Sequence, residues 1–130
     1  MSSVFTQIID GKIPGHFVWQ DDDCVAIMTI QPVNPGHVLV IPRQEVNHWD
    51  DLSDDLASHL MRISKKLAQA IKQAFVCERV GLVIAGFEVP HVHLHVMPTN
   101  SLADFNFTDL QFVDAEALKI AAERIREQLP

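Results

Sequence analysis

The 130-residue sequence has few cysteines, few basic residues and no long apolar run. Cys24 and Cys77 lie far apart and belong to no Cys-x-x-Cys pair, which argues against both a disulfide framework and a zinc knuckle. Ten basic residues against 17 acidic residues give a net charge of −7. A general nucleic-acid binder needs a basic face that neutralises phosphates, so this balance argues against that class.

The chain also lacks any segment that would direct it to a membrane. No stretch approaches the roughly 20 apolar residues that span a bilayer. The start Met1–Phe5 has no basic region and is not followed by an apolar stretch of signal-peptide length,. We therefore expect a cytoplasmic protein without membrane contact. Because 48% of its residues are hydrophobic, the chain is long enough to form one globular domain, residues 1–130, with a buried core.

Three helices are predicted from capping residues and apolar spacing. Ser53 precedes two aspartates and a series of apolar residues at helical intervals, which predicts a long amphipathic helix ending near residue 77. Ser2 or Ser3 is expected to cap a short helix near the start of the chain, and Asp114 to begin a last helix. No internal repeat and no linker divides the sequence.

Short apolar runs bounded by turn residues predict strands between these helices. The predicted strands cover residues 17–19, 25–30, 37–41 and 79–85, followed by a strand around residues 89–98. Together with the helices, they indicate an α+β fold in which a mostly antiparallel sheet lies beside one long helix.

The last predicted strand carries the most informative pattern of the sequence. His91, His93 and His95 alternate with the aliphatic residues Val92, Leu94 and Val96. Since side chains of a strand alternate between its faces, this period of two places the three imidazoles on one face and the aliphatic side chains on the other. Imidazoles titrate near neutral pH and act as base, acid, nucleophile or metal ligand. The pattern therefore indicates chemistry rather than packing.

Two kinds of chemistry fit such a strand. A zinc site needs ligand atoms about 2.0–2.1 Å from one ion, whereas the Cα atoms of His91 and His95 would lie about 13 Å apart. Two neighbouring histidines would need ligands from elsewhere, so a metal centre is the less favoured alternative. A histidine that attacks phosphorus, assisted by a neighbouring histidine, fits better. Gly86 would allow a phosphate to approach the backbone, or would simply form a turn, and His37 offers a fourth imidazole.

The sequence resembles the histidine-triad (HIT) family in three ordered motifs. The run from His91 to Met97 fits the pattern His-φ-His-φ-His-φ-φ, in which φ is apolar. The segments Val4–Pro14, Pro35–Arg43 and Gly86–Pro98 look like the family's opening, second and third motifs. The resemblance covers residues 4–100, leaves a C-terminal extension at residues 104–130, and points to a bacterial, actinobacterial branch. It implies a HIT-like fold with a five-stranded sheet and short terminal helices.

The resemblance also implies a function and a set of site residues. HIT proteins are nucleotide hydrolases and transferases that act at the α-phosphate and assemble as homodimers. By position, His93 would form the nucleotidyl intermediate, and His95 would contact the phosphate and assist the leaving group. His91 would support His93 through its backbone carbonyl, and His37 would complete the hydrogen-bonded set. The purine nucleotide would be bound by the remaining candidates, which are Phe5, Ile27, Thr29, Ile30, Leu39, Glu88 and Val89.

Several positions depart from the family pattern. Zinc-binding relatives carry a Cys-x-x-Cys near the start and a histidine after the second motif, whereas this chain has no cysteine in its first segment and has Glu45 at the histidine position. No cofactor and no metal are therefore expected. Where the family has a carboxylate or amide that holds the ribose hydroxyls, this chain has Thr29, which offers a single hydroxyl,. Phe87 replaces a glutamine in front of the triad.

Residues 80–110 contain no lysine or arginine, so only Arg43 could add a cation to the site. This scarcity predicts that AMP phosphoramidates or singly charged AMP esters are preferred over dinucleoside polyphosphates. A nucleotide-binding regulator with little turnover and a metal-binding module remain as alternatives. Phe105 and Phe107 of the C-terminal extension are expected to pack as a short tail, or else to close the site or join a dimer interface.

Overall fold

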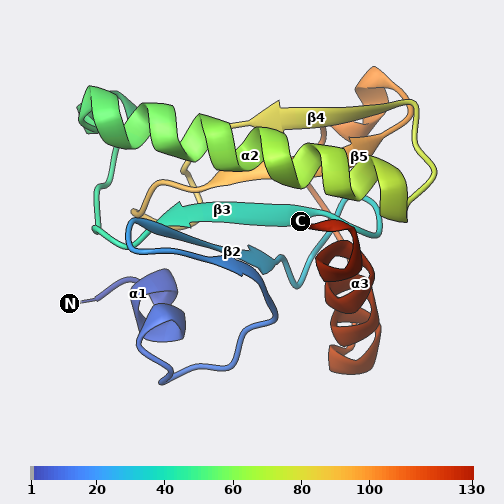
Figure 1. The fold of residues 1–130 in the computed structure, drawn as a ribbon, viewed down its shortest axis with the longest axis horizontal. Coiled ribbons are helices and arrows are strands. Elements are labelled where there is room, and N and C mark those ends of the chain that lie inside the picture. Colours follow the sequence, from blue (N-terminus) through green and yellow to red (C-terminus); the bar gives the residue numbers. More distant parts are fainter. Residues whose placement is uncertain (1) are drawn as a thin grey trace.

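A computed structural model describes residues 2–130 of the chain. It has a mixed α+β architecture, shown in Figure 1. The helices are α1 (Val4–Ile9), α2 (Asp54–Ala74) and α3 (Ala115–Gln128), with short 3-10 turns at Trp49–Asp51 and Leu102–Asp104. The strands are β1 (Phe17–Gln20), β2 (Cys24–Met28), β3 (Val38–Pro42), β4 (Arg79–Val83) and β5 (Leu94–Thr99).

The five strands form one antiparallel sheet in the order β1-β2-β3-β5-β4. The predicted α+β class with a five-stranded antiparallel sheet is therefore confirmed. In this order β5 lies between β3 and β4, and Leu39 of β3 is paired with His95 of β5. The second motif of the sequence and the histidine motif are thus neighbours in the sheet.

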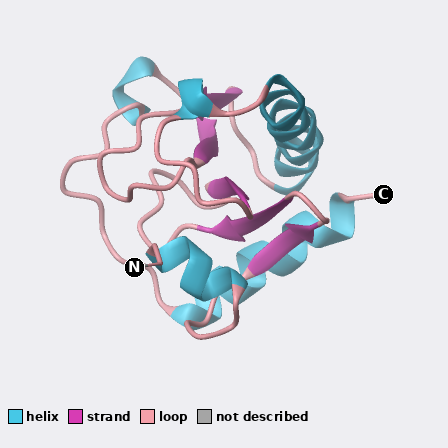
Figure 2. Ribbon diagram, turned by 90° about the vertical axis from the view of Figure 1, so that its left-hand side faces the viewer, coloured by secondary structure: helices cyan, strands magenta, loops and turns pink. Residues whose placement is uncertain are grey.

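The sheet separates two clusters of buried side chains. Along β2, Ala26 and Met28 face a large core that also contains buried residues of α2 and α3, whereas Val25 and Ile27 face a smaller cluster that contains Phe5 of α1. This alternation follows from the period of two along a strand. Figure 2 shows the strands between α2 and α3 on one side and a layer made largely of loops on the other. The functional site lies in this second layer.

The three predicted helix starts are confirmed, because the side chains of Ser3, Ser53 and Asp114 each accept a hydrogen bond from the first turn of their helix,. The predicted end of the long helix is too late, since α2 ends at Ala74. The helical backbone conformation ends at Phe75, which is extended and packs against the turn at Gly36. Only a glycine fits there: Gly36 has φ of +99°, and a Cβ atom would lie 2.7 Å from the Phe75 ring,.

The histidine strand is shorter than predicted. β5 begins at Leu94, and the backbone N–H of Val92 donates to Val46 O (2.8 Å) rather than to a neighbouring strand. The predicted alternation nevertheless holds, because the three aliphatic residues Val92, Leu94 and Val96 belong to the large core. The strand predicted at residues 25–30 likewise ends at Met28, and the strand predicted at 79–85 ends at Val83.

The C-terminal extension folds back onto the rest of the chain. α3 contacts α2, β1 and β2, and Figure 1 shows it upright at one end of the sheet. Phe105 packs against Gly81 of β4, where a Cβ atom would lie 2.6 Å from its ring. None of the helices described in residues 2–130 is both long and apolar enough to cross a membrane.

Candidate active site

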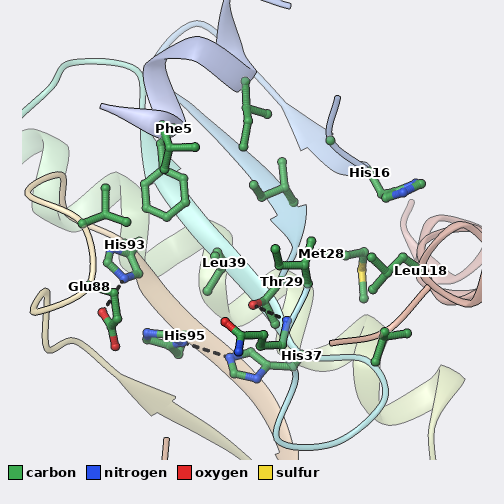
Figure 3. Close-up of a pocket in the computed structure, with 18 of the residues that line it drawn as sticks. Phe5, His16, Met28, Thr29, His37, Leu39, Glu88, His93, His95 and Leu118 are labelled. Carbon is green, nitrogen blue, oxygen red and sulfur yellow. Dashed lines mark hydrogen bonds and ion pairs between the residues drawn. The ribbon is translucent and has the colours of Figure 1, made fainter. Parts of the chain in front are cut away.

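A pocket of about 420 Å³ opens between α1, the sheet and the C-terminal segment. His37, His93 and His95 line it, as do all seven residues predicted to bind the nucleotide. His91 does not line it and is fully buried behind His93. Figure 3 shows His93 beside Phe5 and Glu88, and His95 beside His37. All site residues predicted from the sequence therefore line one pocket, except His91, which is buried next to it.

The His93 ring is oriented by the backbone of His91. Its Nδ1 lies 2.7 Å from His91 O, and since a carbonyl only accepts, Nδ1 carries the ring proton. Its Nε2 lies 3.3 Å from Glu88 Oε2, which accepts a second ring proton when Nε2 carries one; the Nε2 lone pair is available when the ring holds only the Nδ1 proton,. The Phe5 ring packs edge-on against the imidazole, with ring centroids 4.9 Å apart. The basic nitrogen of His93 is thus aimed at the pocket.

The His95 ring carries its proton on the opposite side. Val33 N–H donates to His37 Nδ1 (3.1 Å), so His37 holds its own proton on Nε2 and donates it to His95 Nδ1 (2.9 Å),. His95 Nδ1 is therefore an acceptor, and its proton is on Nε2. Within residues 2–130, the buried His95 Nε2 has no hydrogen-bond partner. It is a free N–H donor that faces the pocket.

Burial keeps His37, His91 and His95 neutral. It lowers the pKa of His37 to about 3 and the pKa of His95 to about 4, with neighbouring histidines adding to each shift,. The pKa of His91 is also below its usual value, again chiefly because of burial. At neutral pH the three rings are therefore uncharged, and the hydrogen-bond partners described above decide where each proton lies.

His91 is held by two contacts that the sequence did not indicate. Its Nε2 lies 2.7 Å from Pro42 O, and its Nδ1 lies 2.6 Å from Ser3 Oγ. The carbonyl again fixes the tautomer, so Nε2 donates to Pro42 and Nδ1 accepts the Ser3 hydroxyl. Ser3 and His91 are 88 residues apart, and no local pattern connects a serine at a helix start with a distant histidine.

The walls of the pocket are mostly apolar. Phe5, Ile27 and Leu39 are buried in the smaller core, whereas the Ile30 side chain is 55% exposed at the rim. Thr29 Oγ1 accepts from the Gln31 backbone N–H (3.3 Å). Further lining residues were not predicted from the sequence; besides Phe107 they are Val4, Ile8, Pro14, Gly15, His16, Met28, Gln31, Leu110, Val113, Ala115 and Leu118.

Phe107 brings the C-terminal extension into the site. Its ring lies 4.7 Å from the His95 ring and 6.1 Å from the His37 ring, measured between centroids. Downstream of it, Val113 N–H donates to Ile30 O (2.9 Å), and Gln31 Nε2 donates to Leu110 O (3.1 Å). The extension therefore closes one side of the pocket in addition to packing as a tail.

Two further expectations concern Gly86 and Arg43. Gly86 does not line this pocket but lines a smaller cavity of about 280 Å³ that also reaches His93, and its φ of +91° is a left-handed conformation that suits glycine,. Arg43 does not reach the pocket, because its Nε donates to Asp21 O (2.7 Å) at the far end of β2 and β3. Among the described residues that line the pocket there is no lysine or arginine.

Two groups of side chains have the residue types of a metal site. Glu88, His93 and His95 place ligand atoms within 4.8 Å of one another, but the hydrogen-bond chain from Val33 puts a proton on His95 Nε2, the nitrogen that a metal would need,. The second group surrounds Asp21, where burial raises the pKa of the Cys24 thiol to about 12. A neutral thiol is a poor ligand. Neither group is well suited to hold an ion.

Residues 10–102 match the HIT domain family. The chain belongs to this family. The match includes all four site histidines and places the chain among nucleotide-binding hydrolases and transferases. An uncharacterised HIT-like protein of Methanocaldococcus jannaschii is 34% identical over 100 residues, which cover 73% of this chain and 77% of the relative.

Further relatives include an enzyme and a solved structure. An asymmetrical bis(5'-nucleosyl)-tetraphosphatase of Schizosaccharomyces pombe is 36% identical over 70% of this chain, and the matching region is 52% of that protein. A crystal structure of a HIT-like protein from Bartonella henselae, described as involved in cell-cycle regulation and holding an unknown ligand, superposes with a TM-score of 0.86. It is 28% identical, with 98% of this chain and 97% of that chain covered. The HIT-like fold is thereby confirmed.

Proposed function

We propose that this HIT protein hydrolyses or transfers the nucleotidyl group of an AMP phosphoramidate or AMP ester through a covalent intermediate on His93. One observation carries the proposal: His93 Nε2 offers a lone pair and His95 Nε2 offers an unpartnered N–H at the same pocket. The ring centroids are 5.1 Å apart. A nucleophile beside a hydrogen-bond donor is what attack on a phosphate requires.

In the first step, His93 Nε2 attacks the α-phosphorus, an N–P bond forms, and the bond from phosphorus to the leaving group breaks. His91 O stabilises the charge that develops on the imidazole, because it already accepts the Nδ1 proton. His95 Nε2–H donates to a phosphate oxygen or to the leaving group, and His37 holds His95 in this tautomer. Water then attacks phosphorus, which releases AMP and restores His93. One water is consumed, and its protons end on AMP and the leaving group.

The apolar part of the pocket suits a purine ring. Phe5, Ile27, Ile30 and Leu39 supply flat or branched apolar surfaces, and we assign ribose and phosphate contacts to the remaining lining candidates Thr29, Glu88 and Val89,. Since no lysine or arginine is among the described lining residues, and Glu88 adds a carboxylate, a polyphosphate would meet little positive charge,. This favours substrates with a single phosphate charge.

Two other functions are each favoured by one observation. The similarity to the tetraphosphatase of S. pombe favours dinucleoside polyphosphates as substrates. The single hydroxyl of Thr29 and the outward position of Phe87, which is 96% exposed, favour a nucleotide-binding regulator with little turnover. Kinetics distinguishes both from our proposal. A polyphosphate hydrolase would have the opposite substrate preference, and in a regulator the function would not depend on His93.

The test mixes the protein with an AMP phosphoramidate and records intact mass after an early quench without acid, together with AMP release. We expect an AMP adduct and turnover in the wild type. His93→Ala should form no adduct and lose activity by a factor on the order of 10⁴, as for removal of other covalent nucleophiles. Comparable kcat/KM values on diadenosine tetraphosphate would contradict the substrate preference. Normal AMP binding without adduct or turnover would contradict the enzymatic proposal.

We also propose that residues 1–130 form a single domain that assembles as a homodimer. β4 is an edge strand of the sheet, and its Leu82 side chain is 40% exposed. An edge with unpaired backbone groups and an apolar side chain can pair with a second copy. Light scattering during size-exclusion chromatography should give twice the chain mass of 14.6 kDa, and the mass of one chain would exclude the dimer.

A further inference from the structure

Two departures from the zinc-binding family pattern contact each other in the structure. Thr6, in the first segment, donates its hydroxyl proton to Glu45 Oε1 (2.7 Å), and the backbone N–H of Ser3 donates to the same oxygen (2.6 Å). Glu45 lies three residues after the end of β3. Ser3 and Thr6 lie at the start of α1, where Ser3 is the N-cap residue. One carboxylate therefore joins segments that are about 40 residues apart in sequence.

The same network continues into the catalytic histidines. Ser3 Oγ donates to His91 Nδ1 (2.6 Å), His91 Nε2 donates to Pro42 O (2.7 Å), and His91 O accepts from His93 Nδ1 (2.7 Å). The ring of His91 is thus fixed on both sides. Its backbone carbonyl, in turn, decides which nitrogen of His93 carries the proton.

A zinc ion does not fit these positions. The side chains that surround His91 Nδ1 are two hydroxyls and one carboxylate, with no thiolate among them. Neutral hydroxyls are not the Cys or His ligands that structural zinc prefers. The Nδ1 lone pair of His91 already accepts the Ser3 hydroxyl. Hydrogen bonds to the Ser3 amide and the Thr6 hydroxyl lower the pKa of Glu45, so the carboxylate is ionised at neutral pH and accepts both.

We propose that Glu45 is a positioning residue for the nucleophile: it holds Ser3 against His91, and the fixed His91 carbonyl keeps the His93 proton on Nδ1 and the lone pair on Nε2. A hydrogen-bonded clamp of Ser3, Thr6, Glu45 and His91 then takes the place of a metal. This inference rests on the proposed role of His93. It adds the residues Ser3, Thr6, Glu45 and His91, none of which lines the pocket.

The experiment compares Glu45→Ala, Glu45→Gln and Ser3→Ala with Glu123→Gln, which changes an exposed carboxylate of α3 away from the site. With the AMP phosphoramidate, we expect Glu45→Ala and Ser3→Ala to lower kcat by roughly tenfold and to leave KM within about twofold. Glu45→Gln keeps an acceptor oxygen and should retain most of kcat. The double variant Ser3→Ala/Glu45→Ala should lose no more than the worse single variant, because both act through His91. Glu123→Gln should match the wild type.

Nitrogen-15 NMR of the His93 ring separates this inference from the proposed function, because it needs no turnover. In spectra recorded above the pH at which the His93 ring loses its second proton, we expect a single Nδ1–H tautomer in the wild type and in Glu123→Gln, and a mixture of tautomers in Glu45→Ala, where only the Glu88 carboxylate at Nε2 still acts on the ring. An unchanged His93 spectrum in a folded Glu45→Ala variant would overturn the inference even if the enzyme is active. A mixture of tautomers in a wild type without turnover would also overturn it. Stoichiometric zinc in the purified wild type would replace the clamp by a metal.

Discussion

His93 and His95 are two residues apart, face the same pocket, and carry their protons on opposite nitrogens. The Nδ1 of His93 meets a carbonyl, His91 O, and must donate, whereas the Nδ1 of His95 meets the N–H of His37 and must accept. When each ring holds a single proton, His93 therefore presents a lone pair to the pocket, and His95 presents a proton. The comparison teaches that the partner behind each ring, rather than the strand pattern, assigns its chemistry.

The two rings also differ in what stands behind them. Behind His93 is a series of side chains, His91, Ser3 and Glu45, that crosses between three segments of the chain. Behind His95 is a shorter path through His37 to the backbone N–H of Val33. The Val33 donor is a backbone N–H, which only a substitution by proline removes, whereas most substitutions of Glu45 remove its carboxylate,. The proton placement of His93 should therefore be easier to disturb by substitutions outside the pocket.

After the loss of the nucleophile itself in His93→Ala, the largest expected effect comes from removing the donor at His95. His95→Ala should lower kcat by a factor on the order of 10²–10³, because a phosphate oxygen or leaving group loses its N–H partner. Since His93 is intact, the AMP adduct should still form slowly, in contrast to His93→Ala. His95→Gln, which retains an N–H donor, is the matched control and should recover part of the loss. A complete absence of adduct in His95→Ala would erase the proposed difference between the rings.

A smaller effect is expected one step farther from the pocket. His37→Ala removes the donor to His95 Nδ1, so the His95 proton can lie on either nitrogen, and kcat should fall by roughly tenfold with little change in KM. In a His95→Gln background the same substitution should have little further effect, because no tautomer remains to be fixed. Steady-state kinetics on the four proteins tests this coupling. Equal losses in both backgrounds would mean that His37 acts independently of His95.

The smallest effect concerns stability rather than turnover. The ordinary histidine pKa is 6.5, whereas burial lowers the pKa of His37 to about 3 and that of His95 to about 4. Between about pH 6.5 and pH 4, the two histidines bind protons in the unfolded chain but not in the folded chain,. The free energy of unfolding therefore decreases as the pH falls through this range. We expect the melting temperature to drop by roughly 5–10 °C between pH 7 and pH 4.5.

His37→Gln is the matched control for this pH dependence. It removes one of the groups with a lowered pKa, so its melting temperature should depend less steeply on pH than that of the wild type over the same range. Asp21 and Glu45 also have lowered pKa values, but their contribution is lost at lower pH. A melting temperature that does not change between pH 7 and pH 4.5 would show that the buried rings are not held neutral.

Much of the fold was predictable because its signals are local. Ser3, Ser53 and Asp114 cap the helices as the sequence indicates, and alternation along residues 92–96 assigns the aliphatic side chains to the core. The element ends were less predictable. α2 stops at Ala74 because Phe75 leaves the helix to pack against Gly36, a contact between distant segments that helical spacing does not encode.

The positions of the candidate site residues were also predictable, whereas their connections were not. The family motifs point to the histidines and to the apolar wall, and the structure places all of the predicted nucleotide-binding residues around one pocket. Nothing in the sequence indicated that Ser3 would contact His91, and the sequence left open whether Phe107 packs as a tail or closes the site, where it lies against His95. Hydrogen bonds and ring contacts over such separations depend on how the sheet and the C-terminal segment fold back.

Residue types and their spacing can be read directly from the sequence: an alternating histidine strand, its motifs, and the scarcity of cations near it. These follow from local rules of strand and helix geometry. Which imidazole nitrogen holds a proton depends on the folded chain, because the carbonyl or N–H that lies behind each ring is placed there by long-range packing,. Since nucleophile and donor differ only in this proton, the division of chemistry between His93 and His95 is a property of the fold.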